Sequence, residues 1–168
     1  MSEKDTIYNS KIKSTGLFNF ADFYSFCYSW LVDSEGYIIT EDKYTEKIAG
    51  DQKTVEVEWT GNKKITDYFK NQLKIKFRIT NMTQVEITDS AGRKKKMNNG
   101  TAEVALKGIL LRDFDSKFET TATKKFLRGI YEKWVIASRV DEMQTNLAKF
   151  CDSFLAEIKA YLDLEGKK

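Results

Sequence analysis

Residues 69–80 read FKNQLKIKFRIT. Apolar and polar side chains alternate along this run; the apolar phase holds Phe69, Leu73, Ile75, Phe77 and Ile79, and the polar phase holds Lys70, Gln72, Lys74, Lys76, Arg78 and Thr80. A period of two is typical of a β-strand with one buried and one solvent-facing side. Because strands of this length twist and coil, we expect a curved sheet.

The segments on either side of this run have the same period. Val55, Val57 and Trp59 alternate with polar residues, and Ala102 begins a last long strand that continues to Leu111. Shorter strands are expected at 85–88 and 93–97, with turns at 61–62, 89–92 and 98–100. Strands joined by such short turns form an antiparallel meander.

Helices are expected before and after the meander. Asn19 is a suitable N-cap, Phe18 and Phe23 occupy the two positions of a hydrophobic staple, and Gly36 is placed to end the helix. A short first strand is expected at 6–14. Residues 121–164 have helical periodicity, with a break near Ser138 where a basic segment gives way to an acidic one.

This order of elements predicts one domain over residues 1–168. The expected fold class is α+β, a curved antiparallel β-sheet meander with an N-terminal helix and a long, broken C-terminal helix packed on one face.

Composition excludes several kinds of active site. The chain of 168 residues contains no His, so His-dependent acid–base chemistry, Ser/His or Cys/His nucleophiles and the usual zinc sites are ruled out. It also lacks the P-loop, dinucleotide-binding and nucleophile-elbow motifs. The carboxylate pairs Glu56/Glu58 and Asp113/Asp115 have no such partners nearby and are interpreted as solvated. We therefore expect no catalytic residue, no metal, no cofactor and no enzymatic activity.

The two cysteines, Cys27 and Cys151, fall on apolar stripes of expected helices, which favours buried, reduced thiols. Residues 1–18 lack a signal-peptide pattern, and the uncharged run 23–32 is too short to span a bilayer. We expect a cytoplasmic protein without a membrane span.

Residues 61–96 form a basic island, with 10 basic and 3 acidic residues. Its candidate phosphate contacts are Lys63, Lys64, Arg93, Lys94, Lys95 and Lys96. A lysine-rich hairpin is equally explained as a solvated strand that its charges protect from aggregation. Lys74, Lys76 and Arg78 are expected to pair across strands with Glu56 and Glu58.

Aromatic residues make up 13% of the chain, and most lie in the apolar phases, which indicates core packing. Tyr44, Tyr68, Tyr131 and Trp134 are the candidates to line a cavity or to face a partner.

The order of helix, long curved meander and long C-terminal helix, with apolar stripes over 54–111 and 126–162, resembles the helix-grip architecture of START-type and birch-pollen-allergen-like proteins. The resemblance implies a sheet folded around the last helix, with an apolar ligand held between them. Two features depart from it, since only one helix lies between the first strands and the Gly-rich loop of the allergen branch is absent. No ligand residues are carried over.

Three functional hypotheses follow. The first is a non-enzymatic interaction or assembly module, with a protein partner or self-association, which uses a sheet edge or the C-terminal helix. The second is a carrier of a small apolar ligand in a helix-grip-like cavity. The third is a sequence-independent nucleic-acid or ribosome-surface binder that uses the basic 61–96 region. We favour the first because it requires no chemistry that the sequence lacks.

Overall fold

Five strands form one antiparallel sheet in the computed structural model, which describes residues 3–112, 122–130 and 137–166. The strands are β1 (Glu3–Phe18), β2 (Ile38–Ala49), β3 (Gln52–Lys64), β4 (Phe69–Thr88) and β5 (Lys94–Arg112). Their order in the sheet is β1-β5-β4-β3-β2, and every neighbouring pair is antiparallel. The predicted meander is therefore confirmed for β2 to β5, and β1 pairs with β5 at the far edge.

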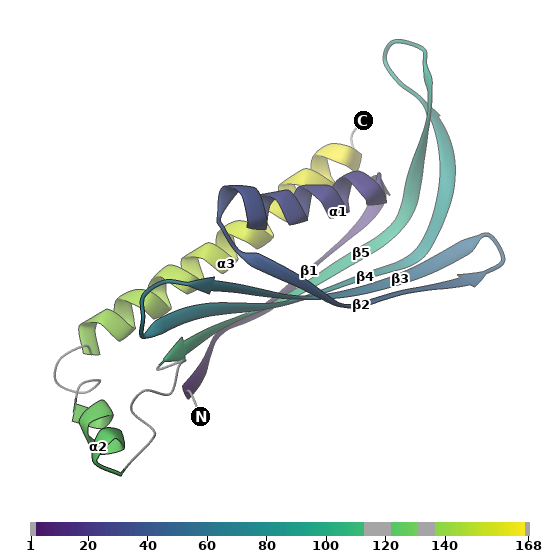
Figure 1. The fold of residues 1–168 in the computed structure, drawn as a ribbon. Helices are drawn as coiled ribbons and strands as arrows, with labels where there is room; N and C mark the ends of the chain where they lie inside the picture. Colours follow the sequence, from purple (N-terminus) through teal and green to yellow (C-terminus); the bar gives the residue numbers. More distant parts are fainter. Residues whose placement is uncertain (1–2, 113–121, 131–136, 167–168) are drawn as a thin grey trace.

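The helices are α1 (Phe20–Ser29), the π-helical turn η1 (Trp30–Ser34), α2 (Ala122–Ile130) and α3 (Ala137–Gly166). Helices α1 and α3 lie on one side of this curved sheet, as predicted, whereas α2 lies apart from it (Figure 1). The long helix α3 runs along β1 and β5. Helix α1 covers β3 and β4, where the Phe23 ring meets Phe77 at 5.9 Å between centroids. We call the side of the sheet under α1 and α3 the inner face and the opposite side the outer face.

The start of α1 follows its sequence signals. The Asn19 side chain accepts a hydrogen bond from the Asp22 amide at 3.0 Å, which satisfies one of the free donors at the helix start. Phe18 and Phe23 pack edge to face with ring centroids 6.2 Å apart, as a hydrophobic staple requires. After η1, Gly36 takes a φ of 78°, so the chain can reverse into β2.

The turn expected at Gly61-Asn62 is wrong. Both residues lie inside β3, and the chain turns later at Thr66, whose hydroxyl accepts from the Phe69 amide at 3.0 Å. A Cβ on Gly61 would lie 2.9 Å from the Ile39 side chain. Glycine is used here because β2 packs closely, not because the chain turns.

The turn expected at 98–100 is also wrong, and the short strands at 85–88 and 93–97 are the distal ends of β4 and β5. A bulge in β4 between Thr80 and Thr83 places Asn81 at a φ of 54°. Gly100 lies beside it, where an added Cβ would be 2.9 Å from the Thr80 carbonyl oxygen. The bulge and this close approach bend the hairpin away from the plane of the sheet (Figure 1).

Only the turn at 89–92 is confirmed, with the Gly92 amide donating to the Asp89 carbonyl at 3.0 Å. The expected first strand is longer than predicted, since β1 pairs with β5 from Glu3 to Phe18. Helix α3 begins at Ala137, next to the predicted break near Ser138. Residues 131–136, which precede α3 and include Tyr131 and Trp134, lie outside the described residues, as do Asp113 and Asp115.

Side chains fill the space between most of α3 and the sheet. A hollow of about 230 Å³ lies where the first turns of α3 meet the ends of β3 and β4, and it is lined by Tyr37, Lys63, Ile65, Asn71, Met143, Asn146 and Phe150. Leu147, Cys151, Phe154 and Ile158 of α3 are fully buried against the inner face. A Cβ added to Gly108 of β5 would lie 2.7 Å from the Cys151 sulfur, so helix and strand are in close contact. The two free cysteines are both buried, as expected.

Candidate interaction surfaces

The predicted phosphate contacts do not meet at one place. Lys63 and Lys64 end β3, whereas Lys94, Lys95 and Lys96 begin β5 and Arg93 immediately precedes it at the tip of the β4–β5 hairpin. Lys64 pairs in register with Lys70 and Lys94 with Thr88, so the two groups are separated by most of β4, roughly 60 Å at ~3.3 Å per residue.

Several of these cations already have local partners. The Lys64 amine lies 2.9 Å from Asp67, and Lys63 lies 5.7 Å from the centre of the Tyr37 ring. Arg93 pairs with Asp89 at 3.2 Å, and Lys94 pairs with Glu86 at 3.6 Å. Lys95 and Lys96 are exposed on the same hairpin.

The predicted aromatic candidates also separate. Tyr68 is half-buried and packs edge-on against Phe69, with ring centroids 5.2 Å apart. Tyr44 lies on β2, at the opposite edge of the sheet from β1, and is 42% exposed. Tyr44 is therefore the described candidate that faces solvent at a sheet edge.

Large apolar side chains are exposed at separate points along β2 and on α1. Ile38 and Ile48, near the two ends of β2, are 74% and 72% exposed, and Tyr28 of α1 is 43% exposed. Strand β2 is the last in the sheet order, so one side of its backbone pairs with none of the strands in the described part of the chain. We call this strand edge, with Tyr28, Ile38, Tyr44 and Ile48, the β2-edge surface. Tyr44 pairs with Val57 on the inner face, whereas Ile38 pairs with Asn62 on the outer face.

Sequence reasoning missed Ile38, Ile48 and Tyr28. The segment 38–49 has no clear alternation, because a bulge between Glu41 and Lys43 shifts its register against β3. The available signal was the position of Ile38 and Ile48 at opposite ends of a charged segment. Such a pattern is unusual for a strand that buries one of its sides.

A shallow hollow lies where α1 meets β2. It is lined by Phe20, Ala21, Tyr24, Ser25 and Tyr44, and its volume is about 330 Å³. The Tyr24 hydroxyl donates a hydrogen bond to Glu41, and the Tyr44 hydroxyl donates to Glu46 at 2.9 Å. Burial, followed by these carboxylate contacts, raises the pKa of Tyr24 and of Tyr44 to about 12, so both hydroxyls keep their protons at neutral pH.

Within the described ranges, no group of three or more Cys, Asp or Glu side chains is placed to hold a metal ion. No helix in the described part of the chain is long and apolar enough to cross a membrane.

The fold is compatible with a helix-grip-like topology, in that a curved antiparallel sheet carries a long C-terminal helix. The chain matches no protein-family model, no curated protein and no solved structure. Its function must therefore be argued from the surfaces themselves.

Proposed function

We propose that this protein is a non-enzymatic interaction module that binds an extended segment of a partner protein along β2. The observation that carries this proposal is the β2-edge surface, which combines an open strand edge with exposed large apolar side chains. Free hydrogen-bonding groups on a strand edge can pair with an added strand, and neighbouring apolar groups add affinity.

The partner segment is defined by the chemistry of this edge. The hollow between α1 and β2 takes one large apolar side chain, which would pack against Tyr24 and Tyr44. Glu41 and Glu46 lie on the same strand and supply carboxylates at its rim. An extended segment with an apolar residue flanked by a basic one is complementary to both features.

The other two hypotheses have weaker support. A carrier needs space between α3 and the sheet. Buried side chains of α3 fill most of that interface, and the hollow beside Met143 and Phe150, about 230 Å³, is smaller than most small-molecule sites. A nucleic-acid binder that uses the predicted cations would need groups at both ends of β4 to act as one site. The free, buried Cys27 and Cys151 suit a reducing compartment, and we therefore place the module in the cytoplasm.

Selection from a displayed peptide library, followed by NMR mapping of the bound peptides, tests this function. We expect selected peptides to alter the amide signals of 38–49 and to slow hydrogen exchange along β2. Ile48→Lys should weaken binding by about tenfold or more, because it places a charge in an apolar contact. Leu164→Lys on α3, where Leu164 is 64% exposed, is the matched control and should leave binding unchanged.

Binding that maps to another surface, or that both lysine variants weaken equally, would contradict the proposal. A stable homodimer whose interface includes β2 would also contradict it, because the partner at this edge would then be a second copy of the chain. Analytical ultracentrifugation over a range of concentrations distinguishes that outcome.

A further inference from the structure

The outer face of the sheet is polar, and opposite charges alternate across most of it. One cross-strand row holds Lys13, Glu103, Arg78 and Glu56, and the next holds Lys11, Ala105, Lys76, Glu58 and Lys43. Ion pairs join Arg78 to Glu56 at 3.7 Å and Lys76 to Glu58 at 3.8 Å, which confirms the predicted cross-strand pairing for these two cations. The prediction is wrong for Lys74, which contacts Thr60 instead. Lys43, 3.0 Å from Glu56, holds the pKa of that carboxyl below its usual value.

The third row breaks this pattern. Lys107 lies directly opposite Lys74, with Asn9 and Thr60 as their outer neighbours. The Lys74 amine donates to the Thr60 hydroxyl at 2.9 Å, and that hydroxyl donates to Asp42. No carboxylate of the described chain lies within ion-pair distance of Lys107. Like charges directly across a sheet destabilise it, so this row is costly to the fold.

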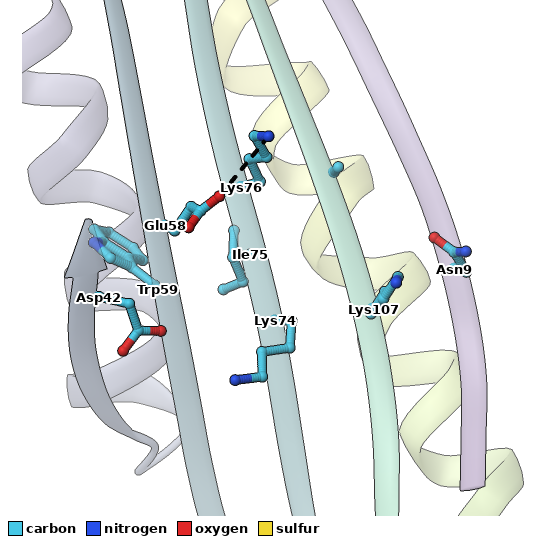
Figure 2. A pocket seen from close by; sticks show the side chains of 9 residues that line it. Asn9, Asp42, Glu58, Trp59, Lys74, Ile75, Lys76 and Lys107 are labelled. Carbon is cyan, nitrogen blue, oxygen red and sulfur yellow. Dashed lines mark ion pairs between the residues drawn. The ribbon is translucent and has the colours of Figure 1, made fainter. Parts of the chain in front are cut away.

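The two lysines line a hollow on the outer face. Its volume is about 360 Å³, and Ala105, the small residue of the second row, leaves room above the sheet. Figure 2 shows Lys74 and Lys107 on neighbouring strands, with Asn9 beyond Lys107 and with Asp42 and Glu58 on the other side of Lys74. The Lys74 amine points toward Asp42 rather than toward Lys107. Cationic groups, an amide and carboxylates thus surround one small space.

We propose that this hollow binds a small phosphorylated polyol, with its phosphate between Lys74 and Lys107. A compact anion there neutralises the two facing lysines and accepts charge-assisted hydrogen bonds from both amines. The hydroxyl groups of the ligand donate to the carboxylates of Asp42 and Glu58 and bond with the Asn9 amide. The volume lies within the range of small-molecule sites.

A small ligand fits this face better than a nucleic acid does. Lys76, Arg78, Lys43 and Lys11 already pair with carboxylates, so a polyanion would have to displace those pairs. Asp42 and Glu58 would also repel a second phosphate placed beside the first. One phosphate therefore matches the charges present, and a row of phosphates does not.

NMR titration of the full chain with glucose 6-phosphate, inorganic phosphate, glucose and a single-stranded oligonucleotide tests the site. Glucose 6-phosphate should shift the amides around Asn9, Lys74 and Lys107 and bind more tightly than inorganic phosphate or glucose. Lys107→Gln and Lys74→Gln should each weaken its binding by about tenfold. Lys149→Gln, the same charge change on exposed α3, should leave binding unchanged.

A second measurement does not depend on binding. Lys107→Glu restores the alternation beside Lys74, so it should raise Tm while it abolishes binding of glucose 6-phosphate. A lower Tm for this variant would overturn the argument that the row is costly.

Three binding results would also overturn the proposal. If Lys149→Gln weakened binding equally, the attraction would be a general effect of charge. If inorganic phosphate bound as tightly as glucose 6-phosphate, the site would not recognise the polyol part of the ligand. Tighter binding of the oligonucleotide to the same amides would assign the face to nucleic acid.

Discussion

Tyrosine hydroxyls beside carboxylates recur where the helices meet the sheet. Tyr8 of β1 donates to Asp152 of α3 at 2.6 Å, and Tyr24 and Tyr44 donate to glutamates of β2. Desolvation and these neighbours raise the pKa of all three tyrosines from 10 to about 12. Each hydroxyl therefore contributes as a neutral donor, and its loss of a proton would leave two anions in contact.

This geometry predicts alkaline destabilisation. Between pH 10 and 12 these tyrosines ionise in the unfolded chain but not in the folded one, so the free energy of unfolding falls as pH rises through that window. Below pH 10 the stabilisation is complete. In a pH titration followed by tyrosinate absorbance, several tyrosines should ionise only near pH 12 or when the protein unfolds. Tyr44→Phe should reduce the number of these late-ionising tyrosines by one. Ionisation of every tyrosine near pH 10 in a chain that stays folded would contradict this.

Gly108 is required by the approach of α3 to β5. A Cβ there would lie 2.7 Å from the Cys151 sulfur and 3.4 Å from Leu147. We expect Gly108→Ala to lower the free energy of unfolding by about 1–3 kcal/mol, because the close packing must be forced apart. Urea denaturation measures this loss, and Gly166→Ala, whose added Cβ meets nothing within 4 Å, is the control.

The same contact can be tested by compensation. Cys151→Ala removes the obstructing sulfur, so the double variant should be more stable than the sum of the two single changes predicts. Strict additivity would mean that the sulfur is not the obstacle.

At the scale of the elements, the bend of the β4–β5 hairpin depends on one close contact between the two strands, at Gly100. The bulge at Asn81 and Met82 brings backbone atoms of β4 against Gly100, where a Cβ would be 2.9 Å from the Thr80 oxygen and 3.0 Å from the Met82 Cα. These obstacles are backbone atoms, which cannot rotate away.

Gly100→Ala should therefore destabilise the protein by about 1–3 kcal/mol in urea denaturation. Asn99→Ala, at the exposed neighbouring position, should change stability by less than about 0.5 kcal/mol. NMR shifts confined to the distal hairpin would show that the change acts on the bend. An unchanged urea midpoint for Gly100→Ala would contradict the close contact between Gly100 and β4.

The strands of the meander and the α1 cap were predictable because their signals are local. Alternation over 54–60 and 69–80 and the Asn19 cap each act within a few residues. The turns predicted at Gly61 and Gly100 are wrong because a glycine can mark either a turn or a place where another part of the chain approaches closely. The sequence alone does not distinguish the two. The neighbours of these glycines, Ile39 and Thr80, are brought near only by strand pairing.

The candidate surfaces were less predictable for the same reason. The facing of Lys74 and Lys107 depends on the register of β4 against β5, and two strands must be aligned before it becomes visible. The exposure of Ile48 depends on β2 being the last strand in the sheet. Tyr44 is a candidate from the sequence alone because it lies outside the apolar phases that hold most of the aromatic residues.

At the scale of the whole molecule, the helices and the sheet share one core. The Tyr161 ring of α3 stacks on Phe26 of α1 at 4.5 Å, and Trp30 of η1 stacks on Phe154 of α3 at 4.9 Å. Phe23 then joins this helix layer to Phe77 of the sheet. The two helices cover neighbouring parts of one inner face, so neither is expected to leave it independently.

The reactivity of the two cysteine thiols measures this cooperativity, because each cysteine belongs to a different helix. Cys27 of α1 and Cys151 of α3 are both 0% exposed, and burial raises the pKa of each thiol, so neither should react with a thiol reagent in the native state. As urea is added, both should become labelled with the same midpoint, measured peptide by peptide by mass spectrometry. Leu164→Cys, exposed on α3, is the control and should react at once. Labelling of Cys27 well before Cys151 would mean that α1 opens alone, and the hollow it forms with β2 would then be transient rather than a fixed surface for a partner.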